Sequence, residues 1–359
     1  MSCATNIRTD YTAYVNKKIS LFFFLIGLLA VISVYSISAG SYSIPALNVI
    51  KSLIGKGSGP EDIVIWNIRA PRIAAALIGG WGLALSGAAI QCLLKNPLAS
   101  PFTLGVSHGA VFGAAFAIVI LNAGMVPHAP ANTGSSAVLN INNLYSVTVF
   151  AFLGAMIATG VILLLSSIKK LSSETIILAG VALSSLFVSG TILLQYFASD
   201  VEVASIVFWT FGDVGRLNWP EVFIILGSAV VVTSYFALNS WNMNALLAGD
   251  DVAGSLGVNV TLARVLGMIM ATLVTALITA FMGVIAFLGL LAPHIARRLV
   301  GPDHRFLIPH SCLMGALLLL VSDTLGRTMI GSGTLPVGVL TSFMGAPLFL
   351  YLLVRGGQK

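Results

Sequence analysis

A long stretch without charge constrains this chain more than any other feature, because no Asp, Glu, Lys or Arg occurs between Lys95 and Lys169. At about 20 apolar residues per crossing, such a stretch holds two membrane-spanning helices and the loop that joins them. Residues 122–143 form that loop, since their Pro, Asn, Gly and Ser residues end one helix before the next begins. The sequence therefore predicts a protein embedded in a lipid bilayer.

The composition agrees, because 57% of the 359 residues are hydrophobic and only 8% are charged. A soluble enzyme, a disordered chain and a secreted disulfide scaffold are thereby excluded. The apolar runs are continuous rather than alternating, which excludes an outer-membrane barrel and leaves helices as the spanning elements. The cysteines Cys3, Cys92 and Cys312 lie far apart and are interpreted as packing residues. Lys and Arg form no basic stripe, so no nucleic-acid partner is expected.

The same length criterion predicts an all-α polytopic protein with ten spans, and one membrane unit over residues 1–359. The expected spans are residues 20–39, 73–94, 103–121, 146–167, 175–197, 219–239, 263–281, 284–299, 306–326 and 336–354. Residues 265–294 could form one long tilted helix or two helices broken at Gly283. The distribution of positive charge favours two helices.

With ten spans and a cytoplasmic amino terminus, both termini are inside. Twelve of the Lys and Arg residues are then cytoplasmic and six lie outside, as the orientation bias of membrane proteins requires. The inner set is Arg8, Lys17, Lys18, Lys95, Lys169, Lys170, Arg264, Arg297, Arg298, Arg305, Arg355 and Lys359, and the outer set is Lys51, Lys56, Arg69, Arg72, Arg216 and Arg327. With a single helix over 265–294 the bias would largely vanish.

Three of the outer cations stand at span ends. Arg69 and Arg72 flank Pro71 where the second span begins, and we expect their side chains to project together into water. Arg327 lies at the outer end of the ninth span, beside Asp323. Positive charge on this side runs against the orientation bias and indicates an acidic partner, although simple snorkelling of the arginines is the alternative.

Two cytoplasmic segments are more than simple connections. Residues 96–101 hold two prolines and predict either a rigid constriction at the inner mouth of a pathway or only a tight helical hairpin. Residues 242–260 are far longer than a connection requires. They predict two short helices separated near Gly249, with Asp250 capping the second and Gly257 ending it. This excess length indicates a surface for a cytoplasmic partner, although an amphipathic segment at the membrane interface without a partner is the alternative.

The sequence lacks the residues that metal binding, ATP hydrolysis and ion-coupled transport require. His294 and His304 lie ten residues apart without a third ligand, so no metal site is expected there. The chain has no Gly-rich phosphate loop and no soluble domain, so it binds no cofactor and cannot itself hydrolyse ATP. Acidic residues at mid-membrane, which ion-coupled carriers generally require, are almost absent; Asp323 and Glu174 lie near span ends.

Segments along nearly the whole chain resemble the FecCD-type permeases, the membrane subunits of ATP-driven importers for ferric siderophores, haem and cobalamin. These segments are RAPR at 69–72, GAAIQ at 87–91, NPLA at 96–99, LGVSHGA at 104–110, LAGVAL at 178–183, GVIAFLGLLAPHIAR at 283–297, LPVGVLT at 335–341 and GAP at 345–347. The resemblance implies a type II importer fold with ten spans in the cytoplasmic (inner) membrane, which agrees with the count above.

The resemblance also implies roles for individual residues. Arg69, Arg72 and Arg327 would receive acidic residues of an extracytoplasmic substrate-binding protein. Asp250, Asp251, Ala253 and Gly257 would belong to the coupling helices that seat on the ATPase, although Val252 stands where an alanine is usual. Asn96 and Leu98 would form the cytoplasmic gate.

The implied partners are a second permease copy or paralogue and two ATPase subunits, which carry ATP and Mg²⁺. The expected cargo is a ferric siderophore, with haem, cobalamin or molybdate as alternatives. Two alternative functions of other classes are an ion-coupled secondary transporter and an intramembrane enzyme. The first would need an ionisable pair at mid-membrane and the second a catalytic dyad or a His cluster inside the spans.

Overall fold

The computed structural model describes residues 2–40, 42–57, 59–123, 141–168, 173–329 and 334–356, and all regular elements in these ranges are helical. In chain order they are α1 (Ser2–Ser38), α2 (Ala46–Leu53), α3 (Pro60–Val64), the π-helical turn η1 (Ile65–Arg69), α4 (Ala70–Leu93), α5 (Val106–Ile120), α6 (Ile141–Ile168), α7 (Ser173–Phe197), α8 (Asp200–Thr210), the 3-10 turn η2 (Val214–Arg216), α9 (Trp219–Leu238), α10 (Ser240–Ala248), α11 (Asp250–Ser255), α12 (Val260–Met282), α13 (Leu288–Val300), α14 (His304–Thr328) and α15 (Val337–Gly356).

The all-helical polytopic fold is confirmed. Within the described ranges, seven helical segments are long and apolar enough to cross a membrane, and α5 and the apolar part of α15 are shorter. Each of the ten expected spans coincides with a helix, but α13 has only 13 residues. The exact count of ten therefore stays a prediction. The loop expected at 122–143 lies mostly outside the described residues.

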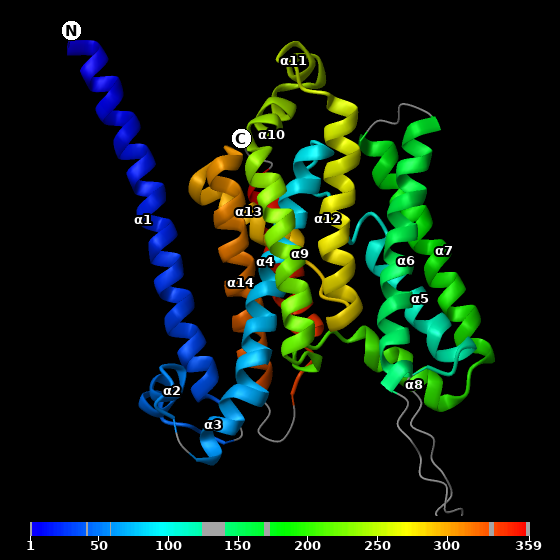
Figure 1. Cartoon of the computed structure of the whole chain (residues 1–359). Coiled ribbons are helices and arrows are strands. Elements are labelled where there is room, and N and C mark those ends of the chain that lie inside the picture. Colours follow the sequence, from blue (N-terminus) through cyan, green and yellow to red (C-terminus); the bar gives the residue numbers. More distant parts are fainter. Residues whose placement is uncertain are drawn as a thin grey trace, which may run out of the picture.

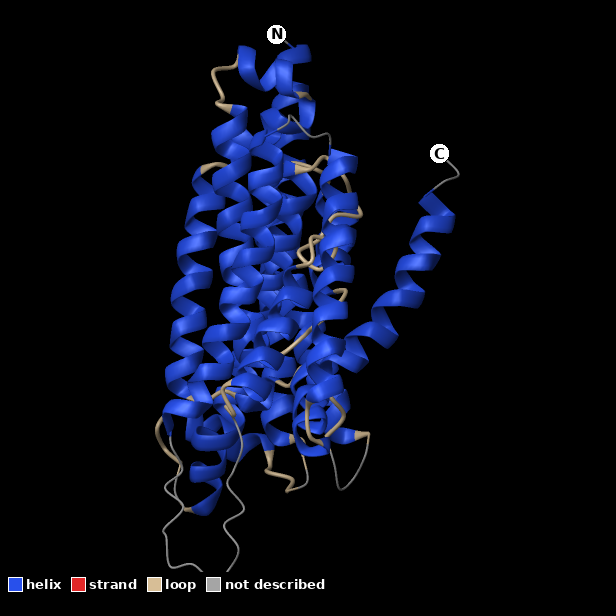
Figure 2. Cartoon of the chain, turned by 90° about the vertical axis from the view of Figure 1, so that its right-hand side faces the viewer, coloured by secondary structure: helices blue, strands red, loops and turns tan. Residues whose placement is uncertain are grey.

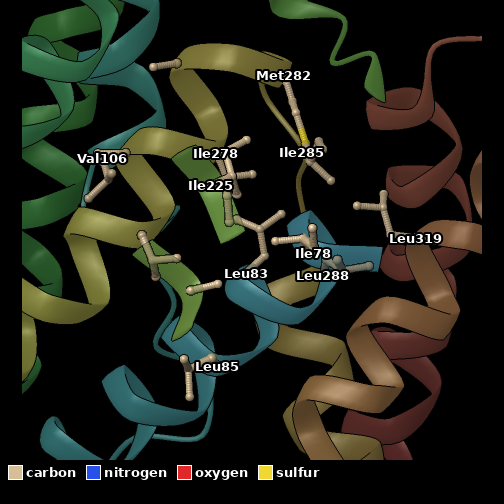
Figure 3. Packing of buried hydrophobic residues seen from close by; sticks show 14 of the residues in the cluster. Ile78, Leu83, Leu85, Val106, Ile225, Ile278, Met282, Ile285, Leu288 and Leu319 are labelled. Carbon is tan, nitrogen blue, oxygen red and sulfur yellow. The ribbon is translucent and has the colours of Figure 1, made fainter. Parts of the chain in front are cut away.

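Helix α4 forms the centre of the bundle, because it packs against α9, α12, α13 and α14. Their apolar side chains meet in one core (Figure 3), to which these helices contribute Ile78, Leu83, Leu85, Ile225, Ile278, Leu288 and Leu319. Gly80 lies so close to α14 that an added Cβ would stand 2.2 Å from the carbonyl oxygen of Gly315. Small residues allow this approach of two backbones, as the glycine spacing predicts.

The helix over residues 265–294 is broken at Gly283, as expected, but the eighth span differs from the predicted range of 284–299. Helix α12 ends at Met282, Gly283 has a φ of +79°, and α13 begins only at Leu288. Residues 283–286 form no helix, and the amide of Asp213 donates to the carbonyl oxygen of Met282 at 2.7 Å. This backbone is packed inside the protein, which is the condition under which a membrane protein tolerates non-helical chain at that depth.

The two ends of the bundle carry different short helices (Figure 1). Helices α2 and α3 lie at one end, here named the α2 end, and α10 and α11 lie at the other, the α11 end. The first turn of α1 and the last turn of α15 both point toward the α11 end. Figure 2 shows α15 leaving the bundle and projecting away from it.

Helix α8 was not predicted from the sequence, although its start is marked. Ser199 caps it, and the carboxylate of Glu202 accepts hydrogen bonds from the Ser199 amide at 2.7 Å and the Ser199 hydroxyl at 2.8 Å. This capping box is a readable signal for a helix start. The span criterion passed over it because α8 has only 11 residues.

Candidate functional site

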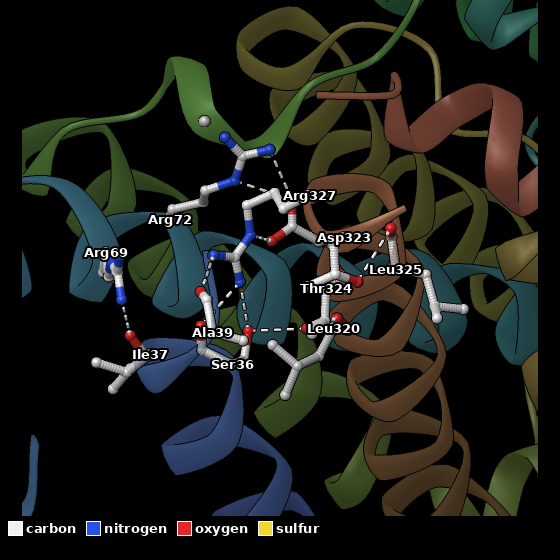
Figure 4. A network of polar contacts seen from close by, with 12 residues as sticks. Ser36, Ile37, Ala39, Arg69, Arg72, Leu320, Asp323, Thr324, Leu325 and Arg327 are labelled. Carbon is white, nitrogen blue, oxygen red and sulfur yellow. Dashed lines mark hydrogen bonds and ion pairs between the residues drawn. The ribbon is translucent and has the colours of Figure 1, made fainter. Parts of the chain in front are cut away.

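The α2 end holds a cluster of five charged side chains, hereafter the arginine cluster (Figure 4). Its members are Arg69, Arg72, Asp213, Asp323 and Arg327. They come from η1, the start of α4, the turn before η2 and the end of α14. The cluster thus joins segments that lie far apart in the sequence.

Arg69 does not project into water as expected, since the residue is only 7% exposed. Its guanidinium donates to the backbone carbonyl oxygens at the end of α1 and just beyond, namely those of Ile37, Ser38 and Tyr42. The last carbonyl groups of a helix have no partner within the helix, and a cation is favoured there. Arg69 therefore closes the end of α1, and the prediction that it stands beside Arg72 in the aqueous face is wrong.

Asp323 is fully buried and accepts from two arginines. The Arg72 Nη2 lies 2.8 Å from Asp323 Oδ1, and the Arg327 Nε lies 3.0 Å from Asp323 Oδ2. Arg72 also reaches Asp213, whose Oδ1 is 3.4 Å away. A buried carboxylate is tolerated where charged partners compensate it, and here both oxygens have one.

Arg327 has further contacts within the chain. Its Nη1 donates to the carbonyl oxygen of Ala39 at 3.1 Å, and its Nη2 donates to the Ser36 carbonyl oxygen at 3.0 Å and the Ser36 hydroxyl at 2.6 Å. The three arginines and two aspartates leave one net positive charge at this surface. The docking role of Arg69, Arg72 and Arg327 stays a prediction, with the internal partners now known. Asp213 was missed because nothing in the sequence places it near Arg72.

Local hydrogen bonds hold the corner at residues 96–101. The Asn96 Oδ1 accepts from the amide of Leu98 at 2.8 Å, and Ser100 and Thr103 bond to each other's backbone. Leu98 is exposed and lines a cavity of about 370 Å³ together with Leu83, Phe102, Phe287 and Phe349. The gate role of Asn96 and Leu98 stays a prediction.

The segment 242–260 forms two short helices separated at Gly249, as predicted. Gly257 has a φ of +84° and follows the last turn of α11. Gly249, not Asp250, is the cap residue, so the expected capping role of Asp250 is wrong. The carboxylate of Asp250 instead forms ion pairs with Lys95 and Arg264. Hydrogen bonding from Lys95 lowers the pKa of Asp250, so the carboxylate is ionised at neutral pH.

The other residues of α11 divide by exposure. Asp251, Val252 and Gly257 are exposed, and Leu256 is 69% exposed. Ala253 is buried, so it packs α11 onto the chain and offers no surface to a partner. Val252 of α11 and Leu256, which directly follows this helix, are thus exposed apolar side chains at the α11 end.

Helix α10 is fixed by a second polar contact. The Asn244 Nδ2 donates to Asp303 Oδ1 at 2.8 Å, and the amide of His304 donates to Asn244 Oδ1 at 2.9 Å. Burial alone would raise the pKa of Asp303, but hydrogen bonds from Arg305 and Asn244 bring it to about 2. In the described ranges, no group of three or more His, Cys, Asp or Glu side chains lies close enough to hold a metal ion.

Comparison with known proteins matches residues 28–355 to the FecCD transport family. The chain belongs to this family. A Methanocaldococcus jannaschii protein, whose name describes it as an ABC transporter permease, is 49% identical to this chain over 98% of each sequence. The hemin transport system permease of Yersinia pestis is 33% identical over 94% of this chain and 96% of its own. A solved inward-facing structure, classed as a metal-chelate type ABC transporter, is 31% identical with a TM-score of 0.79, covering 94% of this chain and 99% of the other.

This FecCD protein is therefore a multi-pass permease of the inner membrane, a transport component rather than a catalyst. Importers of the family act together with an ATPase and a substrate-binding protein. The relatives differ in cargo, since their names include haemin, Fe(3+)-citrate, siderophore and vitamin B12.

Proposed function

We propose that this chain is the permease subunit of an ATP-driven importer that carries a ferric siderophore across the inner membrane, with haem, cobalamin or molybdate as the alternative cargo. One observation carries the proposal: the exposed helix α11, with Val252 and Leu256 in the open, is a surface that a cytoplasmic ATPase would cover. The chain has no phosphate loop of its own, so hydrolysis belongs to that partner.

The pathway follows the non-helical segment 283–287. The cavity beside Leu98 and a second cavity of about 560 Å³ both adjoin this segment, and Phe102 lines both. Their linings are mostly apolar and contain no charged side chain. A conduit of this kind offers a chelate few hydrogen bonds, so it passes the cargo on without holding it. Selection of the cargo then rests with the substrate-binding protein.

A second permease copy or a close relative would complete the pathway. Helix α15 projects from the bundle and exposes Phe343 and Leu350, while Phe343 also lines the second cavity. These two side chains are seven residues apart and so share one face of the helix, and exposed apolar side chains of this size suit a protein interface. Two subunits whose α15 helices meet would enclose the cavities between them and alternate between outward-open and inward-open states.

The test is transport by the reconstituted complex. The tagged chain is purified from its native membrane, its partners are identified, and uptake of ⁵⁵Fe-labelled siderophore, haem and cobalamin into vesicles is measured with and without ATP. We expect an ATPase with a phosphate loop in equal amount and ATP-dependent uptake of the ferric siderophore. Uptake by the chain alone, driven by an ion gradient, would replace the proposal with a secondary carrier. ATP-dependent uptake of haem or cobalamin alone would correct only the cargo.

A further inference from the structure

An ion triad at the α11 end joins three elements that the sequence separates. Asp250, the first residue of α11, places its Oδ1 2.6 Å from the Lys95 Nζ and 3.1 Å from the Arg264 Nη2. Arg264 also reaches Asp250 Oδ2 at 3.2 Å, so it binds both carboxylate oxygens. The triad therefore links α11 to α12 and to Lys95, two residues past the end of α4.

Lys95 stands where the chain turns from α4 into the gate corner. Its φ of +48° is uncommon for a residue with a side chain, so its conformation sets the direction of the corner. The next residue, Asn96, holds the Leu98 amide with its side chain. A force on the Lys95 ammonium thus acts one residue away from the turn that positions Leu98.

Arg264 supplies the fixed side of the joint. Its Nε donates to the carbonyl oxygen of Leu93 at 3.2 Å, close to the end of α4, while its Nη2 holds Asp250. It thus belongs to the long helix α12 and caps the end of α4 at once. Movement of Asp250 relative to Arg264 is therefore movement relative to the bundle.

Helix α11 is built to move as a unit. It has only six residues, and Gly249 and Gly257 at its two ends have φ values of +129° and +84°. Of its two carboxylates, Asp250 alone has an ion-pair partner among the residues described. The helix also packs against α10 and α12, and Ala253 is buried. The triad is thus the main polar connection between α11 and the bundle.

The exposure of the triad suits a reversible joint. The side chains of Lys95, Asp250 and Arg264 are 32%, 45% and 23% exposed. Ion pairs in contact with water are weak and can break and re-form, whereas the pairs of the fully buried Asp323 in the arginine cluster cannot separate without a large penalty. The first kind of pair fits a moving part and the second a fixed one.

We propose that Asp250 is a positioning residue that carries displacement of α11 to the gate corner through Lys95, with Arg264 as the fixed support. This inference rests on the proposed function, in which α11 meets the ATPase. It assigns Asp250 an inward role, toward Lys95, rather than contact with the ATPase alone.

The test is a charge swap in the reconstituted complex of permease, ATPase and binding protein. Lys95→Glu and Asp250→Lys each disrupt the triad, while the double variant restores two positive charges and one negative charge. We expect each single variant to keep the ATPase bound but to lower uptake per ATP hydrolysed about fivefold, and the double variant to recover most of it. Arg298→Glu, an exposed cation of the same end, is the matched control and should leave this ratio unchanged.

A second readout follows the gate itself. In a Cys3→Ser background, Leu98→Cys is labelled with a membrane-impermeant maleimide with and without ATP, while Cys92 and Cys312 are buried. We expect the labelling rate to depend on ATP and this dependence to disappear in Lys95→Glu. Normal coupling in both single variants would overturn the proposal. Loss of bound ATPase in Asp250→Lys without rescue would make Asp250 a docking residue instead. A wild-type chain with no ATPase partner would overturn the proposed function itself.

Discussion

At the scale of single residues, the arginine cluster separates what the sequence can predict from what it cannot. The sequence places three arginines at one membrane face and notes Asp323 beside Arg327, because these two are one helical turn apart. Arg72 and Asp323 are 251 positions apart, so their ion pair depends on the packing of α4 against α14. Because the sequence does not reveal that partner, it predicts arginine side chains exposed to water, and the burial of Arg69 could not be foreseen.

The buried carboxylate predicts a large effect of its removal. Asp323→Asn removes the fully buried negative charge that compensates Arg72 and Arg327, whose side chains are themselves only 16% and 9% exposed. Breaking a buried pair in this way typically costs about 3–5 kcal/mol. We expect a clearly lower melting temperature in detergent, measured by a thermal shift of the purified protein.

The control for Asp323 is Asp200→Asn, an exposed carboxylate in the first turn of α8. That change should cost no more than about 1 kcal/mol, the value of a charge at a helix start. Equal melting temperatures for the Asp323 variant and the wild type would mean that the cluster does not hold the α2 end together.

At the scale of elements, the sequence predicts where the helices lie along the chain better than which helices pack against each other. The glycine spacing indicates close helix crossings but does not say which helices cross. In the structure Gly87 of α4 faces Gly289 of α13, and an added Cβ would stand 1.5 Å from the Gly289 carbonyl oxygen. The partner comes from the far side of the break at Gly283, and only the assembled bundle brings it there.

This crossing predicts a selective cost for one methyl group. Gly87→Ala cannot be accommodated unless α4 and α13 separate, and overpacking of this kind costs about 1–3 kcal/mol or more. Gly227→Ala on α9 is the matched control, because nothing lies within 4 Å of its added Cβ. We expect a lower melting temperature and lower yield for Gly87→Ala, and a melting temperature for Gly227→Ala equal to or above that of the wild type. The reverse order would contradict the packing of α4 against α13.

At the scale of the whole molecule, the sequence predicts the class of protein and the positions of its helices but not the pathway. The cavity beside Leu98 is lined by residues as distant as Leu83, Thr275 and Phe349. Each of these is an ordinary apolar or small polar residue in its own helix, so no local pattern marks it. The cargo is equally invisible, because the lining carries no charge that would select one chelate.

The count of crossings depends on α13, which is too short to span alone. Its 13 residues are about 20 Å long at 1.5 Å per residue, against a hydrocarbon core of about 30 Å. Residues 283–287 precede it without helical structure, and five residues span at most about 16 Å at 3.3 Å per residue. Together they are long enough for a full crossing, which would return the chain to the α11 end.

This argument predicts the sidedness of three exposed positions. Five expected spans separate Lys56 from Leu256, and two more separate Leu256 from Arg298. In the Cys3→Ser background, an impermeant maleimide should label Lys56→Cys in right-side-out vesicles, and Leu256→Cys and Arg298→Cys only in inverted vesicles. Labelling of Arg298→Cys from the same side as Lys56→Cys would remove the eighth crossing and, with it, the even count. Labelling of Leu256→Cys from that side would instead show that one of the five spans before it, such as the short α5, fails to cross.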